Sequence, residues 1–182
     1  MSRAKPVIAA AMLALSPAAY ALDGMSFEYG HSDSSNANVN LYRVSAQWNW
    51  HKKLIETGNW HLGGYWESSF GYWVNNSFAR TNSGLIDFGF TPVLRFQQTK
   101  ISGLSPYAEL GVGFHFLSST SVGTQRQFGS SFQFGDHAGA GVRFGGKGQY
   151  DLGYRYQHLS NAGIKQPNQG VNFHQVRFAY HF

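Results

Sequence analysis

The sequence predicts an all-β protein, an eight-stranded antiparallel transmembrane β-barrel of the outer-membrane type. Short segments of alternating apolar and polar residues follow one another along the chain. Aromatic residues make up 16% of the chain and charged residues only 13%, and the aromatic residues recur near segment ends, as in the interfacial girdles of barrels. After the N-terminal segment no run reaches the roughly 20 apolar residues of a membrane-spanning helix. A secreted β-sandwich is the alternative that alternation alone leaves open.

The N-terminal segment has the form of a secretory signal peptide. Two early basic residues precede an apolar stretch at residues 7–15, and a small-x-small motif ends at Ala21. We expect cleavage after Ala21, so that residues 1–21 are the signal peptide and residues 22–182 form a single barrel domain. The chain has no cysteine, so no disulfide would stabilise it after export.

The first half of the barrel is predicted from four alternating segments. The second is the clearest, because aromatic and aliphatic residues from Tyr42 to Trp50 alternate with polar ones, and alternate residues of a strand share a face. Polar loops are expected at residues 31–38 and 75–83, and a short charged turn at residues 51–58. The expected strands are 25–30, 42–50, 60–73 and 86–96.

Four further segments complete the predicted barrel. Turns are expected at residues 100–105 and, because it is rich in glycine, at residues 145–148. Longer polar loops are expected at residues 118–130 and 161–171. The expected strands are 108–116, 132–144, 150–156 with a continuation toward Ser160, and 176–182, which ends on an aromatic residue.

The apolar face of the strands is expected at even-numbered positions and on the outside. The charged strand residues are assigned to the interior, because a charge facing lipid costs about 2–4 kcal/mol at mid-membrane whereas a paired interior tolerates it. The balance of acids and bases indicates a filled barrel rather than a pore. These residues are Glu28, Glu67, Asp87, Glu109, Asp151, Arg43, Arg95, Arg143, Arg155 and Arg177.

Three polar residues, His158, Ser160 and Asn172, are expected to face the membrane instead. Export by the signal peptide places the N-terminus on the periplasmic side, so the longer loops and the end of the seventh strand are extracellular. A histidine can act as base for a serine nucleophile on the same face. Ordinary interfacial residues are the alternative, since His-x-Ser is a common pattern.

The residues around this pair are more specific. The run His158-Leu-Ser-Asn-Ala-Gly163, followed by Lys165-Gln-Pro-Asn168 and Gly170, resembles the lipid A 3-O-deacylase (PagL) family of outer-membrane enzymes. A looser similarity covers residues 135–144 and the overall eight-strand length. The resemblance implies an esterase that removes a 3-hydroxyacyl chain from lipid A of lipopolysaccharide in the outer leaflet of the bacterial outer membrane.

The resemblance also implies roles for the residues of the run. Ser160 would be the nucleophile and His158 the general base, while the Asn161 side chain and the Gly163 amide would form the oxyanion hole. The third member of the triad is open. A family member has glutamate at the position of Asn172, where an amide can orient a histidine but cannot stabilise its charge.

Other residues near the outer end have weaker assignments. Asp136 is an alternative third member, expected roughly opposite Gln157, and His174 is expected to be a girdle residue. Arg80, Arg126 and Lys165 lie in outer loops, where they would contact lipid A phosphates or simply be solvated.

The sequence indicates no metal site, because no histidine spacing resembles a ligand set. It also indicates no cofactor, since there is no nucleotide-binding loop, and no nucleic-acid surface, since the charges form no basic patch. Membrane lipid is the expected partner, and a homodimer is allowed. The competing functions are a non-enzymatic barrel acting in adhesion or membrane integrity, and an acyltransferase.

Overall fold

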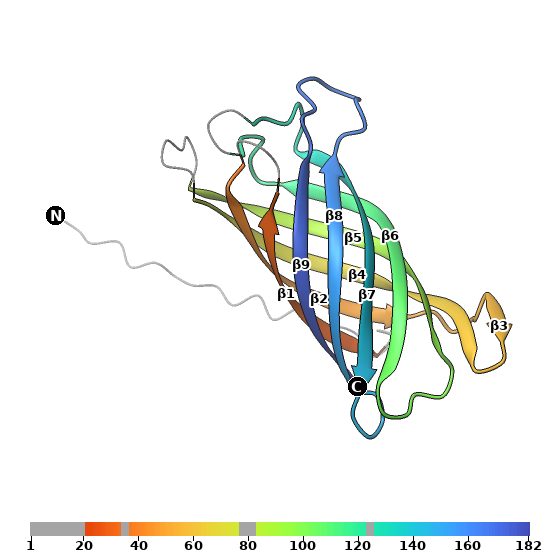
Figure 1. The fold of residues 1–182 in the computed structure, drawn as a ribbon. Helices are drawn as coiled ribbons and strands as arrows, with labels where there is room; N and C mark the ends of the chain where they lie inside the picture. Colours follow the sequence, from red (N-terminus) through yellow and green to blue (C-terminus); the bar gives the residue numbers. More distant parts are fainter. Residues whose placement is uncertain (1–20, 34–36, 77–82, 123–125) are drawn as a thin grey trace, which may run out of the picture.

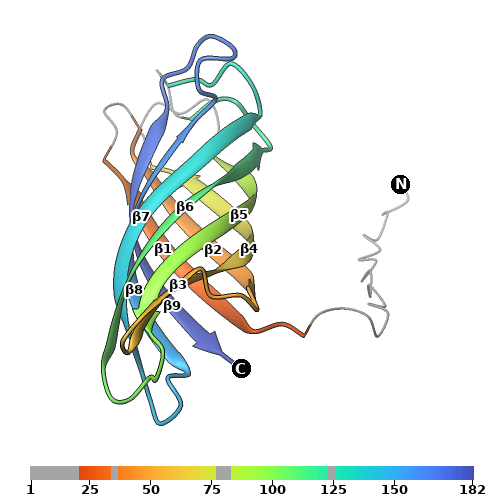
Figure 2. The same ribbon diagram turned by 90° about the vertical axis from the view of Figure 1, so that its right-hand side faces the viewer.

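The computed structural model describes residues 21–33, 37–76, 83–122 and 126–182. Except for Ala21, the expected signal peptide lies outside these residues. Nine strands belong to one antiparallel sheet that curls into a barrel (Figures 1 and 2). They are β1 (Gly24–Ser32), β2 (Val39–Asn49), β3 (Ile55–Thr57), β4 (Trp60–Asn75), β5 (Gly84–Gln98), β6 (Ser105–Leu117), β7 (Phe132–Phe144), β8 (Tyr150–Ser160) and β9 (Val171–His181).

The sheet closes on itself, which excludes the sandwich. Strand β2 pairs with β1 on one side and with β4 on the other, so eight strands form the wall. Strand β3 pairs only with β4 and projects beyond the wall (Figure 1). The interpretation of residues 51–58 as a plain turn is therefore wrong, because a short hairpin strand forms within them. Among the described residues there is no helix long and apolar enough to cross a membrane.

The outward face is apolar and aromatic, as expected, but the even-number rule is wrong for β1. There Phe27 and Tyr29 are exposed and Glu28 is buried. Phe27 lies opposite Val44 of β2, and opposite residues share a face of the sheet, so the register reverses the numbering in this strand. In the other wall strands, β2 and β4 to β9, the exposed residues are even-numbered except for Asn49 at the end of β2.

The interior holds the charged residues that the sequence placed there. Arg155 is central: its Nη1 donates to Glu28 at 2.9 Å and to Glu67 at 3.0 Å, and its Nε to Glu109 at 2.6 Å. Nine of the ten charges are buried, whereas Arg143 is half-buried and donates to the Gly148 carbonyl at 2.9 Å. Paired charges fill the barrel, which makes the outside the available surface for chemistry.

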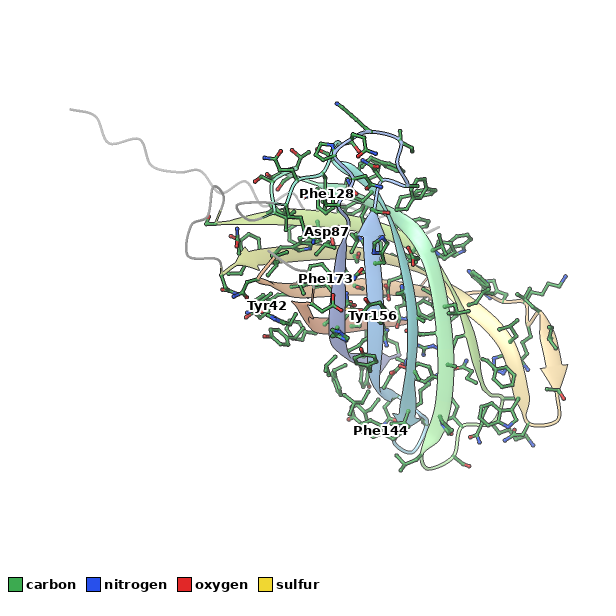
Figure 3. All side chains as sticks on the ribbon, turned by 45° about the horizontal axis from the view of Figure 1, so that its top comes forward. Tyr42, Asp87, Phe128, Phe144, Tyr156 and Phe173 are labelled. Carbon is green, nitrogen blue, oxygen red and sulfur yellow. The ribbon has the colours of Figure 1, made fainter. Side chains whose placement is uncertain are left out.

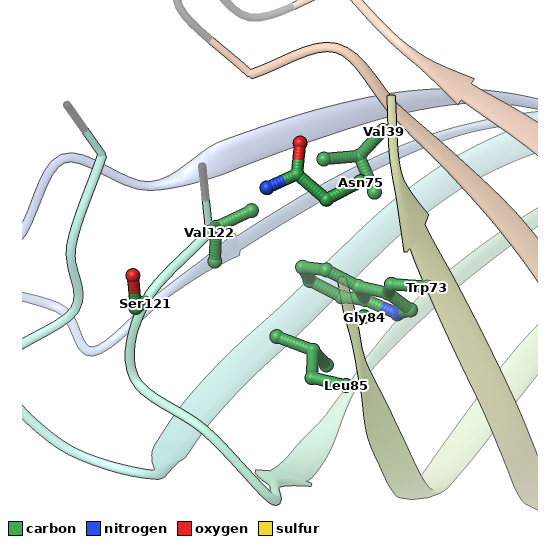
Figure 4. A pocket seen from close by; sticks show the side chains of 7 residues that line it. All are labelled: Val39, Trp73, Asn75, Gly84, Leu85, Ser121 and Val122. Carbon is green, nitrogen blue, oxygen red and sulfur yellow. The ribbon is translucent and has the colours of Figure 1, made fainter. Parts of the chain in front are cut away.

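An apolar cluster fills the interior at the loop end. Phe128 of the β6–β7 loop is buried there, and Figure 3 shows it at this end of the barrel, with Phe144 at the opposite end. A small hollow beneath the same loop lies inside the barrel rather than at the outward-facing residues (Figure 4). It is lined by Val39, Trp73, Asn75, Gly84, Leu85, Ser121 and Val122.

Candidate active site

Strands β7, β8 and β9 place the candidate residues side by side on the outside of the barrel. His158 of β8 lies opposite Asn172 of β9 and opposite Asp136 of β7. Ser160 follows two residues later on the same face, opposite Phe134, and both His158 and Ser160 are half-buried. The outward direction expected from alternation is therefore found at the very end of the strand.

His158 hydrogen-bonds Asn172. Its Nδ1 lies 2.5 Å from the Asn172 Oδ1. Because an amide oxygen only accepts, Nδ1 donates and the proton of the neutral ring is held there, which leaves Nε2 as the basic nitrogen. This is the tautomer that a general base facing a serine requires.

Asp136 lies directly opposite His158, which corrects the register expected from the sequence. The prediction that Asp136 faces Gln157 is wrong by one residue, because Phe144 pairs with Tyr150 and Gln149 belongs to the turn. Opposite residues have Cβ atoms about 4.5–5.5 Å apart. Asp136 therefore flanks the imidazole on the side away from Asn172.

Ser160 ends β8 immediately before a sharp turn. The Ala162 amide donates to its Oγ at 3.5 Å, and Ala162 and Gly163 have φ values of 53° and 79°. In the described part of the chain no hydrogen bond joins His158 to Ser160. The two side chains share a face, and a direct hydrogen bond between them would require side-chain rotation, which is common among catalytic groups before substrate binds.

Asn161 organises the turn from a fully buried position. Its Nδ2 donates to the Lys165 carbonyl at 2.7 Å, and its Oδ1 accepts from the Gly163 amide at 3.0 Å. The Asn161 side chain and the Gly163 amide, both expected in the oxyanion hole, therefore form hydrogen bonds within the loop itself. The backbone N–H of Asn161 donates to the Asn168 Oδ1 at 2.9 Å, which gives Asn168 a structural role that the sequence did not predict.

Gly170 lies against the imidazole of His158. Its φ is +60°, and a Cβ at this position would be 2.8 Å from Cε1 and 3.3 Å from Nε2 of that ring. Only glycine fits both the backbone conformation and the close approach. The sequence motif contains Gly170, but no role was predicted for it. A glycine directly before a strand could have indicated a special backbone conformation at this position.

The profile of the family described as "Lipid A 3-O-deacylase (PagL)" matches residues 40–181, which include every residue of the site described above. The chain belongs to the lipid A 3-O-deacylase (PagL) family. This is a family of ester hydrolases in the outer membrane, and the chain is accordingly an outer-membrane barrel of that family.

Individual relatives agree. "Lipid A deacylase PagL" of Pseudomonas aeruginosa is 36% identical over 135 residues, 74% of each chain. "Lipid A deacylase PagL" of Bordetella bronchiseptica is 32% identical over 166 residues, 87% of this chain and 83% of the relative. The solved structure titled "Crystal structure of the outer membrane enzyme PagL" matches with a TM-score of 0.74 and 30% identity, over 86% of this chain and 98% of that one.

The loop cations of this PagL-family chain have different surroundings. Arg126 donates from Nη1 to the carbonyl of Gln169 at 2.8 Å and to that of Gly170. Lys165 is exposed, and Arg80 lies outside the described residues. Arg126 thus contacts the loop that carries the site, whereas the expected phosphate contacts of all three cations stay a prediction.

His174 belongs to a polar cluster next to the site on the outer face. Its Nε2 is 3.2 Å from the Asp33 Oδ2, and its Nδ1 is 2.5 Å from the Tyr154 hydroxyl. It lies opposite Tyr156, two pairs along from the His158–Asn172 pair and on the same face. Its polar atoms have partners, in keeping with an interfacial residue. Across residues 21–33, 37–76, 83–122 and 126–182, no group of three or more metal-ligating side chains is arranged to hold a metal.

Proposed function

We propose that this protein hydrolyses the ester that links the 3-O-hydroxyacyl chain to lipid A, and that it does so as a serine esterase. Membership of the PagL family and the names of both relatives support the substrate and the reaction. The observation that carries the mechanism is the His158–Asn172 hydrogen bond, with Ser160 on the same outward face. A site outside the barrel suits a substrate whose acyl chains lie in the membrane.

Each residue has a role in the proposed reaction. Nε2 of His158 takes the proton of the Ser160 hydroxyl as Oγ attacks the ester carbonyl. The tetrahedral intermediate then expels the sugar 3-hydroxyl group, which takes the proton back from the imidazolium and leaves an acyl-enzyme. Water, deprotonated by His158, attacks the acyl-enzyme and releases the hydroxy acid with Ser160 restored.

The turn after Ser160 supplies the proposed oxyanion donors. The Ala162 amide is already directed at Oγ at 3.5 Å, and the Gly163 amide follows it. Asn161 holds this turn through three hydrogen bonds. We therefore propose the Ala162 amide as a donor, joined by the Gly163 amide once it releases the Asn161 Oδ1 and by the Asn161 side chain once it releases the Lys165 carbonyl.

Lipid A masses before and after incubation with the purified barrel test the proposal. We expect loss of one hydroxyacyl unit with wild type and with Ser68→Ala, which removes another outward serine. Ser160→Ala and His158→Ala should lose the activity. Wild-type turnover by Ser160→Ala would remove the serine mechanism; an unchanged mass with wild type would indicate a non-enzymatic barrel, and a mass gain an acyltransferase.

Two further expectations accompany this function. We propose that residues 1–21 are removed on export, so the N-terminal sequence of the membrane-inserted protein should begin at Leu22. We also propose that a homodimer is compatible with the outward-facing site, to be checked by cross-linking in native membranes. Neither expectation affects the assignment of the catalytic residues.

A further inference from the structure

The β6–β7 loop crosses to the β8–β9 loop, which carries the site. The contacts come from four consecutive residues, Arg126 to Gly129, none of which has a catalytic role in the proposed reaction. They reach the part of the β8–β9 loop between Lys165 and Gly170.

Arg126 binds the end of the β8–β9 loop next to the base. Its Nη1 donates to the Gln169 carbonyl at 2.8 Å and to the Gly170 carbonyl. Partial burial lowers the pKa of the guanidinium from its ordinary value, but it stays charged at neutral pH. Charge-assisted hydrogen bonds of this kind are stronger than neutral ones. Gly170 is the residue against which the His158 imidazole packs.

The next residues hold the middle of the same loop. The Gln127 amide donates to the Gln169 Oε1 at 2.9 Å. Phe128, buried in the apolar cluster, forms a β-bridge with Asn168. This bridge anchors the β8–β9 loop to the cluster that fills the barrel end.

Gly129 lies against the start of that loop. A Cβ at Gly129 would be 2.4 Å from the Lys165 carbonyl oxygen and 2.7 Å from its carbon, so the two backbones touch. The Lys165 carbonyl is also the acceptor of the Asn161 side chain. Contact at Gly129 therefore acts on the residue that organises the turn after Ser160.

We propose that Arg126–Gly129 form a clamp of positioning residues that sets the His158 imidazole and the turn after Ser160 in place. The clamp reaches the base through Gly170 and the oxyanion turn through the Lys165 carbonyl. This inference rests on the proposed esterase function and adds residues from a loop that does not carry the catalytic run. The competing role of Arg126 is direct binding of a lipid A phosphate.

Two substitutions test the clamp by different means. Arg126→Ala removes the two carbonyl contacts, and Gly129→Ala pushes the loops apart without changing charge. We expect each to lower kcat by about ten- to a hundredfold, the effect of a small misplacement of catalytic groups, with KM changed by less than about twofold. The loss should be the same on lipid A with both phosphates and on lipid A from which they have been removed.

Matched controls come from the turn at the opposite end of the barrel. Lys147→Ala removes a turn cation, and Gly146→Ala adds a Cβ where nothing lies within 4 Å. Both should keep wild-type kcat. All variants are compared at equal amounts of folded barrel, judged by the shift of the unheated band on a denaturing gel.

Hydrogen–deuterium exchange gives a readout that does not depend on turnover. We expect residues 161–170 to exchange faster in both clamp variants than in wild type and in the two controls. Unchanged kcat and exchange in both variants would overturn the clamp. So would a KM increase limited to Arg126→Ala on phosphorylated lipid A, which would assign phosphate binding. Wild type that leaves lipid A intact would refute the esterase function instead, while exchange would still decide whether the clamp exists.

Discussion

Replacement of Asn172 tests how the proposed base is held. The Asn172 Oδ1 accepts from Nδ1 of His158 at 2.5 Å and fixes the tautomer in which Nε2 is basic. Asn172→Ala leaves Nδ1 without this acceptor, so the ring can adopt the other tautomer or rotate. Ser160, the turn after it and the barrel wall stay as they are.

The size of the effect follows from the loss of one neutral hydrogen bond. Such a bond contributes about 0.5–1.5 kcal/mol, and about 1.4 kcal/mol corresponds to a tenfold change in rate. We therefore expect Asn172→Ala to lower kcat by about two- to twelvefold. His158→Ala removes the base itself and should cost roughly a hundred- to ten-thousandfold.

A carboxylate at the same position should act in the opposite direction. Asn172→Asp keeps the side-chain length and adds a charge that stabilises the imidazolium formed during the reaction. Hydrogen bonds to charged groups contribute about 1 kcal/mol more than neutral ones, so kcat should rise by roughly fivefold. Asn172→Glu, which restores the residue type that the family resemblance implies, should keep or raise activity.

Initial rates of hydroxy acid release at saturating lipid A measure these changes. Asp136→Ala is the comparison, because Asp136 flanks the same imidazole without a hydrogen bond to it. We expect a smaller loss than for Asn172→Ala. A larger loss at Asp136 would transfer the orienting role to that residue, and wild-type rates for both variants would refute the triad. An inactive Asn172→Glu would show that the position does not correspond to the family's acid.

Three further substitutions, each with its own expected outcome, probe the packing around His158, the ionic interior and the lipid-facing wall. Gly170→Ala should lower kcat at least tenfold, since its Cβ would be 2.8 Å from the imidazole of His158. The control Gly58→Ala, at a glycine with a similar φ and no neighbour within 4 Å, should leave kcat unchanged. Equal kcat values for the two variants would contradict the packing argument. Arg155→Met removes the ion pair of the buried Glu67 and one of the partners of Glu28 and of Glu109, and it should lower the free energy of unfolding in urea by about 3–5 kcal/mol. We expect wild-type kcat at low urea. A stability change below about 1 kcal/mol would mean that the network rearranges. Leu110→Arg places a charge toward lipid in mid-strand, opposite Leu94 and Ala138, and should cost about 2–4 kcal/mol in vesicles. Leu104→Arg in a turn should cost little. Similar costs at both positions would contradict the assigned depth.

Much of this protein follows from the alternation of its residues. The period of two is a local property of the extended backbone, so it predicted the strands and which residues share a face before any contact was known. The aromatic residues near strand ends and the balance of charges then indicated an aromatic exterior and an ionic interior. Alternation also placed His158 and Ser160 on the outer face. The role of the pair as base and nucleophile came from the resemblance to the PagL family, not from periodicity.

Register and loop packing required the three-dimensional structure, because they depend on residues far apart in the chain. One extra residue in the β7–β8 turn puts Asp136 rather than its neighbour opposite His158. The pairing of Phe27 with Val44 puts odd-numbered residues of β1 on the same face as even-numbered residues of β2. Arg126 meets Gly170 across 44 positions of sequence, a contact that no local pattern encodes. The candidate catalytic run could be read from the chain, but the contacts that hold it in place arise only when the barrel closes and its loops pack.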